Sequence, residues 1–202
     1  MMKRLALLLA TALFVTGVAG GATDSAQQLV VDVSNQVIQA LKKEPDAAQR
    51  DPNTIYNLLN QIVAPHFDFD ATAKLVLGHY WRDTNPQQQQ RFIEEFRTHL
   101  VHFYAVSLAK YKDQKIDYKP LHAPAAADEV VVNTEVQQQN GLAIPIDYRM
   151  HLKGGDWKVY DITIEGVSLV TSNRSNFAAE IQQGGIDTLT DRLAQRNRQK
   201  GI

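Results

Sequence analysis

Hydrophobic residues in the first third of the chain recur every three or four positions, which is typical of amphipathic helices. This spacing predicts a first helix over residues 25–41 and a second over residues 52–65, with prolines near its two ends. Asp68 or Asp70 is placed to cap a third helix that ends at Gly78. The first part of the chain is therefore predicted to be helical.

The longest predicted helix begins at the sequence Thr84-Asn85-Pro86, where a capping residue precedes a proline. It is expected to continue to about residue 111. Its apolar face is rich in aromatic residues: Phe92, Ile93, Phe96, Leu100, Phe103, Tyr104, Leu108 and Tyr111. A face of this size has to be buried against other elements.

The hydrophobic period changes to two after residue 115, which indicates β-strands. Four strands are predicted, ending with a run rich in β-branched and aromatic residues over 157–164. Asn140-Gly141 and Gly154-Gly155 are hairpin turn residues. The strands should therefore form an antiparallel meander with one polar face, and the other face, which carries Ile146, should lie against the helices.

Gly166 ends the last strand, and apolar residues then return at helical spacing until Gly184 and Gly185, beyond which a final helix is predicted. The predicted fold class is α+β, with an antiparallel, twisted, four-stranded sheet packed against a helical subdomain. The predicted parts are a helical part at about 25–111, a sheet at about 115–165 and closing helices at about 168–198.

Residues 1–22 have the features of a secretory signal peptide. Lys3 and Arg4 precede an apolar run and a group of small residues suited to cleavage. No later segment has the roughly 20 apolar residues needed to cross a bilayer. The sequence therefore predicts an exported protein, located in the periplasm, whose mature domain comprises residues 23–202.

Composition narrows the possible chemistry. The chain has no cysteine, which excludes disulfides and thiol catalysis. Removing the signal peptide takes away two of 21 basic residues and none of 22 acidic ones, so the net charge changes from −1 to −3. This balance gives no electrostatic reason to expect nucleic acid binding. The basic C-terminal segment could contact an anionic lipid surface or an acidic partner, but such segments more often solvate a helix end.

Two groups of residues are candidate metal ligands. His66, Asp68 and Asp70 could form a metal site, but no second cluster stands at ligand spacing, and a capped turn is the favoured interpretation. His99 and His102 lack the glutamate of the zinc-protease motif and are expected at the surface or at the edge of the core. No metal site is predicted.

Ser168 and Asp161 are candidate catalytic residues. The sequence around Ser168 lacks the second glycine of a nucleophile elbow, so a role as a backbone cap is favoured. Asp161 interrupts an apolar strand and could act as a general base in a pocket. A structural carboxylate that binds backbone amides or an arginine is favoured, because burying it unpaired would cost several kcal/mol.

Three blocks of sequence resemble the MlaC family of periplasmic phospholipid-binding proteins, also called toluene-tolerance auxiliary proteins. The blocks are FDFDATAKLVLGHYW at 67–81, PQQQQRFIEEFRTHLVHFYA at 86–105, and WKVYDITIEGVSLV at 157–170 with the RSNF and GGIDTL segments that follow. One departure is Asn173, where relatives often carry an aromatic residue. The resemblance implies a sheet similar to that of nuclear transport factor 2, packed with helices around an apolar cavity.

The resemblance also implies a function. It implies a carrier that holds phospholipid as its cargo, needs no cofactor and no catalytic residue, and maintains outer-membrane lipid asymmetry. The implied partners are phospholipid, an inner-membrane lipid ABC transporter complex and an outer-membrane lipoprotein–porin complex, with transient proximity to membranes. Two alternatives stay open: an enzyme of similar shape acting on a hydrophobic substrate with Asp161 as general base, and a periplasmic chaperone.

The candidate lipid-contacting residues are large apolar side chains of the third predicted helix, the long helix, the sheet face and the segment after Gly166. Sequence alone does not separate filled core from open cavity at these positions. The candidates are Leu75, Val76, Phe92, Phe96, Leu100, Phe103, Tyr104, Val132, Ile144, Ile146, Tyr148, Met150, Ile162, Ile164, Val167 and Phe177.

Overall fold

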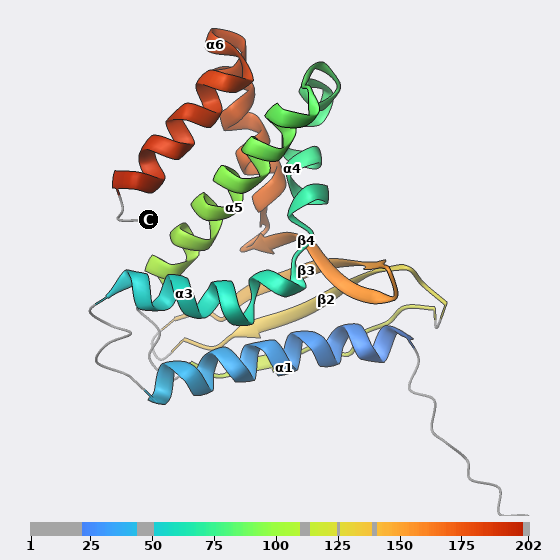
Figure 1. Ribbon diagram of the computed structural model, residues 1–202. Helices are drawn as coiled ribbons and strands as arrows, with labels where there is room; N and C mark the ends of the chain where they lie inside the picture. The colour runs from blue at the N-terminus through green and yellow to red at the C-terminus, as the bar shows by residue number, and fades with distance from the viewer. Residues whose placement is uncertain (1–21, 44–50, 110–113, 125, 139–140, 200–202) are drawn as a thin grey trace, which may run out of the picture.

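The computed structural model describes residues 22–43, 51–109, 114–124, 126–138 and 141–199. Figure 1 shows the arrangement of its elements. The helices are α1 (Ala22–Lys43), α3 (Pro52–Ile62), η1 (Ala64–His66), α4 (Phe69–Leu77), η2 (Gly78–Asp83), α5 (Pro86–Leu108) and α6 (Leu169–Gln199), where η marks a short 3-10 helix. The strands are β1 (Ile116–Tyr118), β2 (Glu129–Val136), β3 (Ile144–Lys153), β4 (Asp156–Ile164) and β5 (Val167–Ser168). The predicted signal peptide up to residue 21, Tyr111 and Asn140 lie outside the described residues.

Side chains cap the helix starts, including the predicted start at Asn85-Pro86. Asn85 and Gln88 form a reciprocal capping box at the start of α5: the Gln88 N–H donates to Asn85 Oδ1 at 2.9 Å, and the Asn85 N–H donates to Gln88 Oε1 at 3.1 Å. Asp51 caps α3 by accepting from the Asn53 N–H at 3.0 Å. These caps satisfy backbone donors that have no partner inside the helix.

The sheet is antiparallel with the strand order β1-β2-β3-β4-β5. The predicted meander is confirmed, but the predicted count of four strands is wrong. Glu165 and Gly166, both with positive φ (51° and 81°), form a two-residue hairpin turn that returns the chain, so that Ser168 pairs with Thr163. A fifth strand of two residues is too short to leave a periodic signal in the sequence.

Helix α1 covers the apolar face of the sheet, as Figure 1 shows. Ala26 and Val30 are buried with sheet residues in one cluster that includes Val130, Val132, Met150, Trp157 and Val159. The Trp157 indole N–H donates to the Ser25 hydroxyl at 3.0 Å, which fixes the start of the helix on the sheet. The prediction that the apolar sheet face packs against a helix is therefore confirmed.

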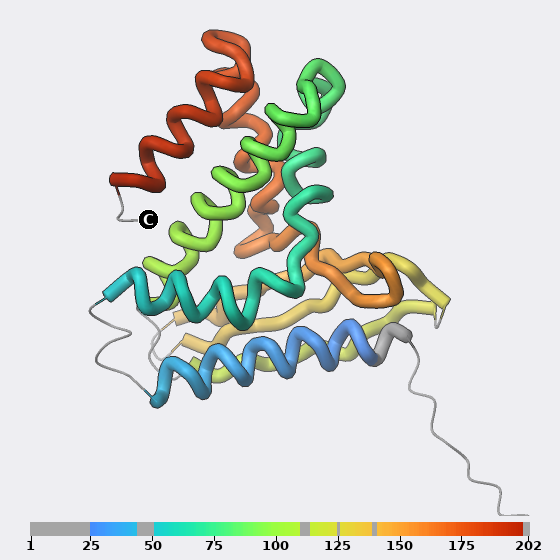
Figure 2. The backbone as a smooth tube through the Cα atoms, viewed as in Figure 1, coloured from blue at the N-terminus to red at the C-terminus, as the bar shows by residue number. Residues whose placement is uncertain are grey.

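The segment before α4 contacts the edge of β4 that β5 leaves unpaired. Phe67 forms an isolated parallel bridge with Val159, and the Asp68 N–H donates to the Val159 carbonyl at 2.8 Å. A bulge in β4 lets the Tyr160 carbonyl lie 2.9 Å from the Thr72 hydroxyl of α4. Figure 2 follows the backbone from this edge into α4 and, after β5, into α6, so both helices begin at the same edge.

Helices α4, α5 and α6 pack together around a cluster of phenylalanines. Phe92 and Phe96 stack with ring centroids 5.4 Å apart, and Phe177 of α6 meets them edge-on at 6.0 Å and 5.6 Å. Gly185, with φ 76° and ψ 177°, breaks α6 at the predicted position. The second part of α6 then turns back so that Leu189 and Leu193 join the same core.

None of the helices in the described residues is both long enough and apolar enough to cross a membrane.

Candidate lipid-binding site

Three separate hydrophobic clusters meet at an apolar cavity of about 50 Å³. One cluster lies among α4, α5 and α6, one between α1 and the sheet, and one among α1, α3 and α5. The cavity is lined by Leu59, Val63, Ala64, Phe67, Phe69, Leu100, Val101, Tyr104, Ile162 and Leu169. It is therefore the point where the helical part, the sheet and α3 come together.

The cavity is small for a ligand. A volume of about 50 Å³ compares with about 30 Å³ for the share of one water molecule in the liquid, and with about 300–1,000 Å³ for pockets that hold small ligands. Acyl chains can enter only if the surrounding elements move apart.

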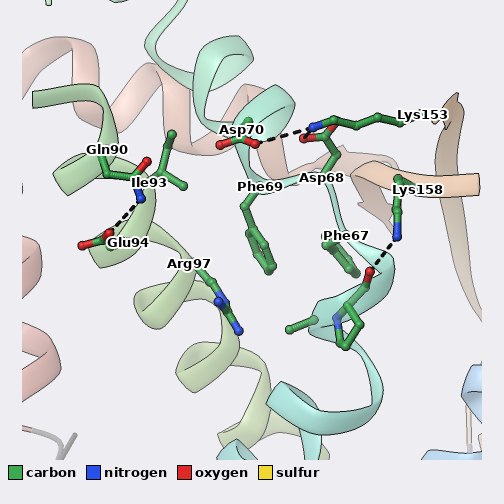
Figure 3. A pocket seen from close by; sticks show the side chains of 12 residues that line it. Phe67, Asp68, Phe69, Asp70, Gln90, Ile93, Glu94, Arg97, Lys153 and Lys158 are labelled. Carbon is green, nitrogen blue, oxygen red and sulfur yellow. Dashed lines mark hydrogen bonds and ion pairs between the residues drawn. The ribbon is translucent and has the colours of Figure 1, made fainter. Parts of the chain in front are cut away.

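A larger hollow of about 490 Å³ opens to solvent next to the cavity. Figure 3 shows its lining, in which charged side chains from α4, α5 and the sheet surround two phenylalanines. Ala64, Phe67 and Phe69 line both spaces. The Phe67 and Phe69 rings stack with centroids 5.4 Å apart, and together they form a partition between the hollow and the cavity.

Asp68, between these two phenylalanines, holds the partition segment in place. Its carboxylate caps α4 by accepting from the Ala71 N–H at 3.0 Å, and it also contacts His151 Nε2 at 3.0 Å and Lys153 Nζ at 2.9 Å. Burial tends to raise the pKa of Asp68, but the hydrogen bonds from Ala71, Lys153 and His151 outweigh it and hold the pKa below its ordinary value. A charged Asp68 thus ties the start of α4 to β3.

Arg97 and Lys158 are the other basic residues that face the hollow. The guanidinium carbon of Arg97 lies 5.5 Å from the centroid of the Phe69 ring, a cation–π contact, and its Nη2 donates to Asn60 Oδ1 at 3.1 Å. Lys158 Nζ donates to the Pro65 carbonyl at 2.9 Å. The outer hollow therefore combines basic side chains with two aromatic rings that also line the apolar cavity.

The predicted lipid-contacting residues fall into several places. Leu100, Tyr104 and Ile162 line the cavity. The closed helical core holds Val76, Phe92, Phe96 and Phe177, and the core under α1 holds Val132, Tyr148 and Met150. In that core, burial raises the pKa of Tyr148 to about 12.

The remaining candidates are less buried. Ile144, Ile146 and Ile164 are partly buried at the far end of β3 and β4. Leu75, Phe103 and Val167 are exposed, with 38%, 55% and 62% of their surface accessible. The structure does not bring these six side chains to the cavity, and contact of the sixteen candidates with lipid stays a prediction.

Sequence reasoning missed seven of the lining residues: Leu59, Val63, Ala64, Phe67, Phe69, Val101 and Leu169. Phe67 and Phe69 flank the capping residue Asp68 in a turn that the sequence predicts, but the sequence does not show that the two rings line a cavity. The others belong to ordinary apolar helix faces, and nothing in their spacing separates them from core.

Asp161 and Ser168 together cap α6. The Val170 N–H donates to Asp161 Oδ1 at 3.1 Å, the Ser168 hydroxyl donates to Asp161 Oδ2 at 2.7 Å, and the Thr171 N–H donates to Ser168 Oγ at 3.1 Å. Asp161 lines neither the cavity nor the hollow. This geometry agrees with the favoured structural interpretation of both residues.

The histidines also have clear positions. His66 lies in η1, and the carboxylate of Asp68 is occupied by the contacts described above. Within the described ranges, no group of three or more His, Asp or Glu side chains is placed to hold a metal ion. The prediction that His102 lies at the surface or at the edge of the core is wrong, because only 4% of its surface is accessible and its ring lies 6.3 Å from that of Tyr56.

Comparison with known proteins identifies the family. The family model described as "MlaC protein" matches residues 31–195. The chain belongs to the MlaC family. This MlaC chain is 31% identical over 170 residues to toluene tolerance protein ttg2D of Pseudomonas putida, an alignment that covers 82% of this chain and 77% of the relative.

Two further relatives extend the comparison. The intermembrane phospholipid transport system binding protein MlaC of Haemophilus influenzae is 26% identical over 188 residues, or 92% of this chain and 87% of that protein. A solved structure of a phospholipid-binding protein from Ralstonia solanacearum, in complex with a phospholipid, superposes with a TM-score of 0.80 at 33% identity. That match covers 88% of this MlaC chain and 99% of the Ralstonia chain.

Proposed function

We propose that this protein is a periplasmic phospholipid carrier whose cargo places its acyl chains in an enlarged form of the apolar cavity. The observation that carries the proposal is the position of this cavity, at the junction of three hydrophobic clusters in an MlaC-family fold. The phospholipid complex of the Ralstonia relative supports it. Residues 1–22 serve as the signal peptide, and residues 23–202 form the lipid-binding domain.

The free energy of acyl-chain transfer explains why a carrier is needed. Two acyl chains carry roughly 30 methylenes, and exposing each to water costs about 0.8 kcal/mol, so free diffusion of the lipid has a barrier above about 20 kcal/mol. A bilayer and an apolar cavity offer the chains similar surroundings. Loading and release therefore need no covalent step and no catalytic residue.

The cavity has to open before it can bind acyl chains. The lining comes from separate elements, namely α3, η1, the start of α4, α5, β4 and the start of α6. Space is gained when these elements separate along the boundaries between clusters, while each cluster keeps its own packing. Dispersion attraction between the acyl chains and the cavity walls then replaces the attraction between the separated clusters.

We also propose two protein partners, on the basis of membership in the MlaC family. The carrier receives or delivers phospholipid at an inner-membrane lipid ABC transporter complex and at an outer-membrane lipoprotein–porin complex. Exchange between these two sites would maintain the lipid asymmetry of the outer membrane.

The test is direct analysis of the cargo. Protein purified from the periplasm without detergent is extracted with organic solvent, and the extract is examined by mass spectrometry and phosphate analysis. We expect diacyl phospholipid in a fixed ratio to protein. Folded protein that yields no lipid, and that takes up none when delipidated and incubated with phospholipid vesicles, would contradict the proposal.

A further inference from the structure

Two basic side chains of the outer hollow have neutral hydrogen-bond partners. Arg97 of α5 donates to the side-chain oxygen of Asn60, and Lys158 of β4 donates to the backbone carbonyl of Pro65. Neither forms a salt bridge with a carboxylate among the described residues. Both therefore keep a positive charge that is available to an anion.

The acidic residues of the hollow leave this charge in place. Asp68 and Asp70 are both engaged by Lys153, at 2.9 Å and 3.5 Å. Glu94 accepts from Gln90 Nε2 at 2.7 Å, and Figure 3 shows its carboxylate directed away from the two phenylalanines. The three basic and three acidic residues of the hollow balance in number, but Arg97 and Lys158 have no carboxylate partner among the described residues, and their charges lie beside the partition, on its α5 and β4 sides.

The polar hollow lies directly beside the apolar cavity, as the binding of a phospholipid requires. A lipid phosphate is joined to its acyl chains through only a few atoms, so a seat for the phosphate must lie next to the space for the chains. The hollow and the cavity share Ala64, Phe67 and Phe69 as lining. An arginine can bind phosphate oxygens with two parallel hydrogen bonds, and a lysine can add a point charge.

We infer that the outer hollow is the seat of the lipid phosphate, held by Arg97 and Lys158, and that acyl chains enter the inner cavity past Phe67 and Phe69. This assignment rests on the proposed function. Arg97 couples phosphate binding to the entry of the acyl chains, because its guanidinium lies over the Phe69 ring. When the guanidinium turns to a phosphate, it leaves the face of the ring, and the ring then moves aside at lower cost.

A competition between two lipids with identical chains tests the seat. Delipidated protein is equilibrated with vesicles that contain phosphatidylglycerol and a diacylglycerol of the same chain composition. The protein is then separated from the vesicles, and the ratio of the two bound lipids is measured by mass spectrometry. The ratio isolates recognition of the phosphate because the acyl chains are the same.

The variants are Arg97→Gln, Arg97→Lys and Lys158→Gln, with Arg91→Gln as matched control. Arg91 lies on the same helix, but it pairs with Asp191 of α6 outside the hollow. We expect Arg97→Gln to lower the ratio of phosphatidylglycerol to diacylglycerol about tenfold, which corresponds to about 1.4 kcal/mol. Lys158→Gln should lower it in the same direction, Arg97→Lys should restore part of it, and Arg91→Gln should leave it at the wild-type value.

The possible outcomes distinguish failure of the phosphate-binding inference from failure of the proposed carrier function. A ratio that is unchanged in both Arg97→Gln and Lys158→Gln, while wild type still binds lipid, would overturn the seat and leave the carrier proposal standing. Wild-type protein that takes up neither lipid would instead contradict the carrier proposal and, with it, the seat.

A free phosphate is the other possible source of the same chemistry. Calorimetric titration of delipidated protein with inorganic phosphate and with glycerol 3-phosphate distinguishes it. We expect binding of either anion to be at least about tenfold weaker than binding of the intact lipid, because the chains supply most of the affinity. Tight, Arg97-dependent binding of inorganic phosphate with an unchanged lipid ratio would assign the hollow to a soluble anion and overturn the inference.

Discussion

The carboxylate of Asp161 in β4 accepts a hydrogen bond from the backbone N–H of Val170 in α6 at 3.1 Å. Between the two residues the chain passes through the end of β4, the Glu165–Gly166 turn, the two residues of β5 and Leu169. This bond fixes the first turn of α6 on the sheet, and Ser168 strengthens it by donating to the same carboxylate. The position of the C-terminal helix therefore depends on one buried side chain of the last long strand.

Replacing Asp161 should destabilise the fold. Asp161→Ala removes the cap of α6 and leaves buried polar partners unsatisfied, so we expect a loss of about 2–3 kcal/mol in the free energy of unfolding. Urea unfolding followed by circular dichroism measures this. Asp161→Asn should cost less because its amide oxygen can still accept from Val170.

Ser168→Ala serves as the comparison, since it removes the hydroxyl and leaves the carboxylate. Because Asp161 lines neither space, lipid content per folded molecule should stay at the wild-type value in all three variants. Unchanged stability together with loss of a turnover activity would favour the enzyme alternative.

Asp68 should make stability depend on pH on the acid side. Its pKa in the folded protein is below the ordinary value of 3.8, so the unfolded chain binds the proton more readily. The stabilisation is complete well above pH 4 and is lost as the pH falls from about 5 through the folded pKa. Asp68→Asn should lower the unfolding free energy at pH 7 by about 1–2 kcal/mol and flatten its decline between pH 5 and pH 3.

The neighbouring exposed residue Asp70 provides the control for this experiment. Asp70→Asn removes a longer contact to Lys153, at 3.5 Å, and should change stability by less than about 0.5 kcal/mol. Unfolding curves recorded across the pH range would contradict the assignment if Asp68→Asn and Asp70→Asn behaved alike.

Much of the fold could be predicted because local chemistry decides it. The helix start at Asn85-Pro86, the change from helical to alternating period after residue 115 and the break at Gly185 all depend on residues close together in sequence. The strand Val167–Ser168 could not be predicted in this way. Its pairing depends on the backbone conformation of the preceding turn, and two residues carry no period.

The site was less predictable than the fold because residues distant in sequence define it. Phe92, Phe96 and Phe177 are large apolar residues on helix faces, which fits either a cavity wall or a filled core. In the folded protein they pack against one another, because α6 lies beside α5. The C-terminal half of α5, at Leu100, Val101 and Tyr104, lines the cavity together with Ile162 of β4. Whether a residue lies in the core or lines the cavity depends on how α4, α5, α6 and β4 are placed relative to one another. The hydrophobic period of the sequence does not predict this placement.

Two leucine-to-phenylalanine substitutions should separate cavity from filled core. Leu100 lines the cavity, whereas Leu189 of α6 is fully buried in the helical core. Leu100→Phe should extend into free space, so the delipidated variant should melt close to wild type and bind less phospholipid. Leu189→Phe should overpack the core and cost about 1–3 kcal/mol. Melting curves of delipidated proteins, together with phosphate analysis of reloaded ones, test both; equal destabilisation by the two changes would place Leu100 in filled core.

Photo-crosslinking shows whether acyl chains occupy the junction of the three clusters. A phospholipid with a diazirine near the end of one chain is loaded into the protein and irradiated, and the modified residues are identified by peptide mass spectrometry. We expect adducts at cavity residues such as Leu59, Val101 and Ile162, with Phe92 and Phe96 unmodified. Adducts confined to exposed apolar residues such as Phe103 or Val167, with none at the junction, would contradict it.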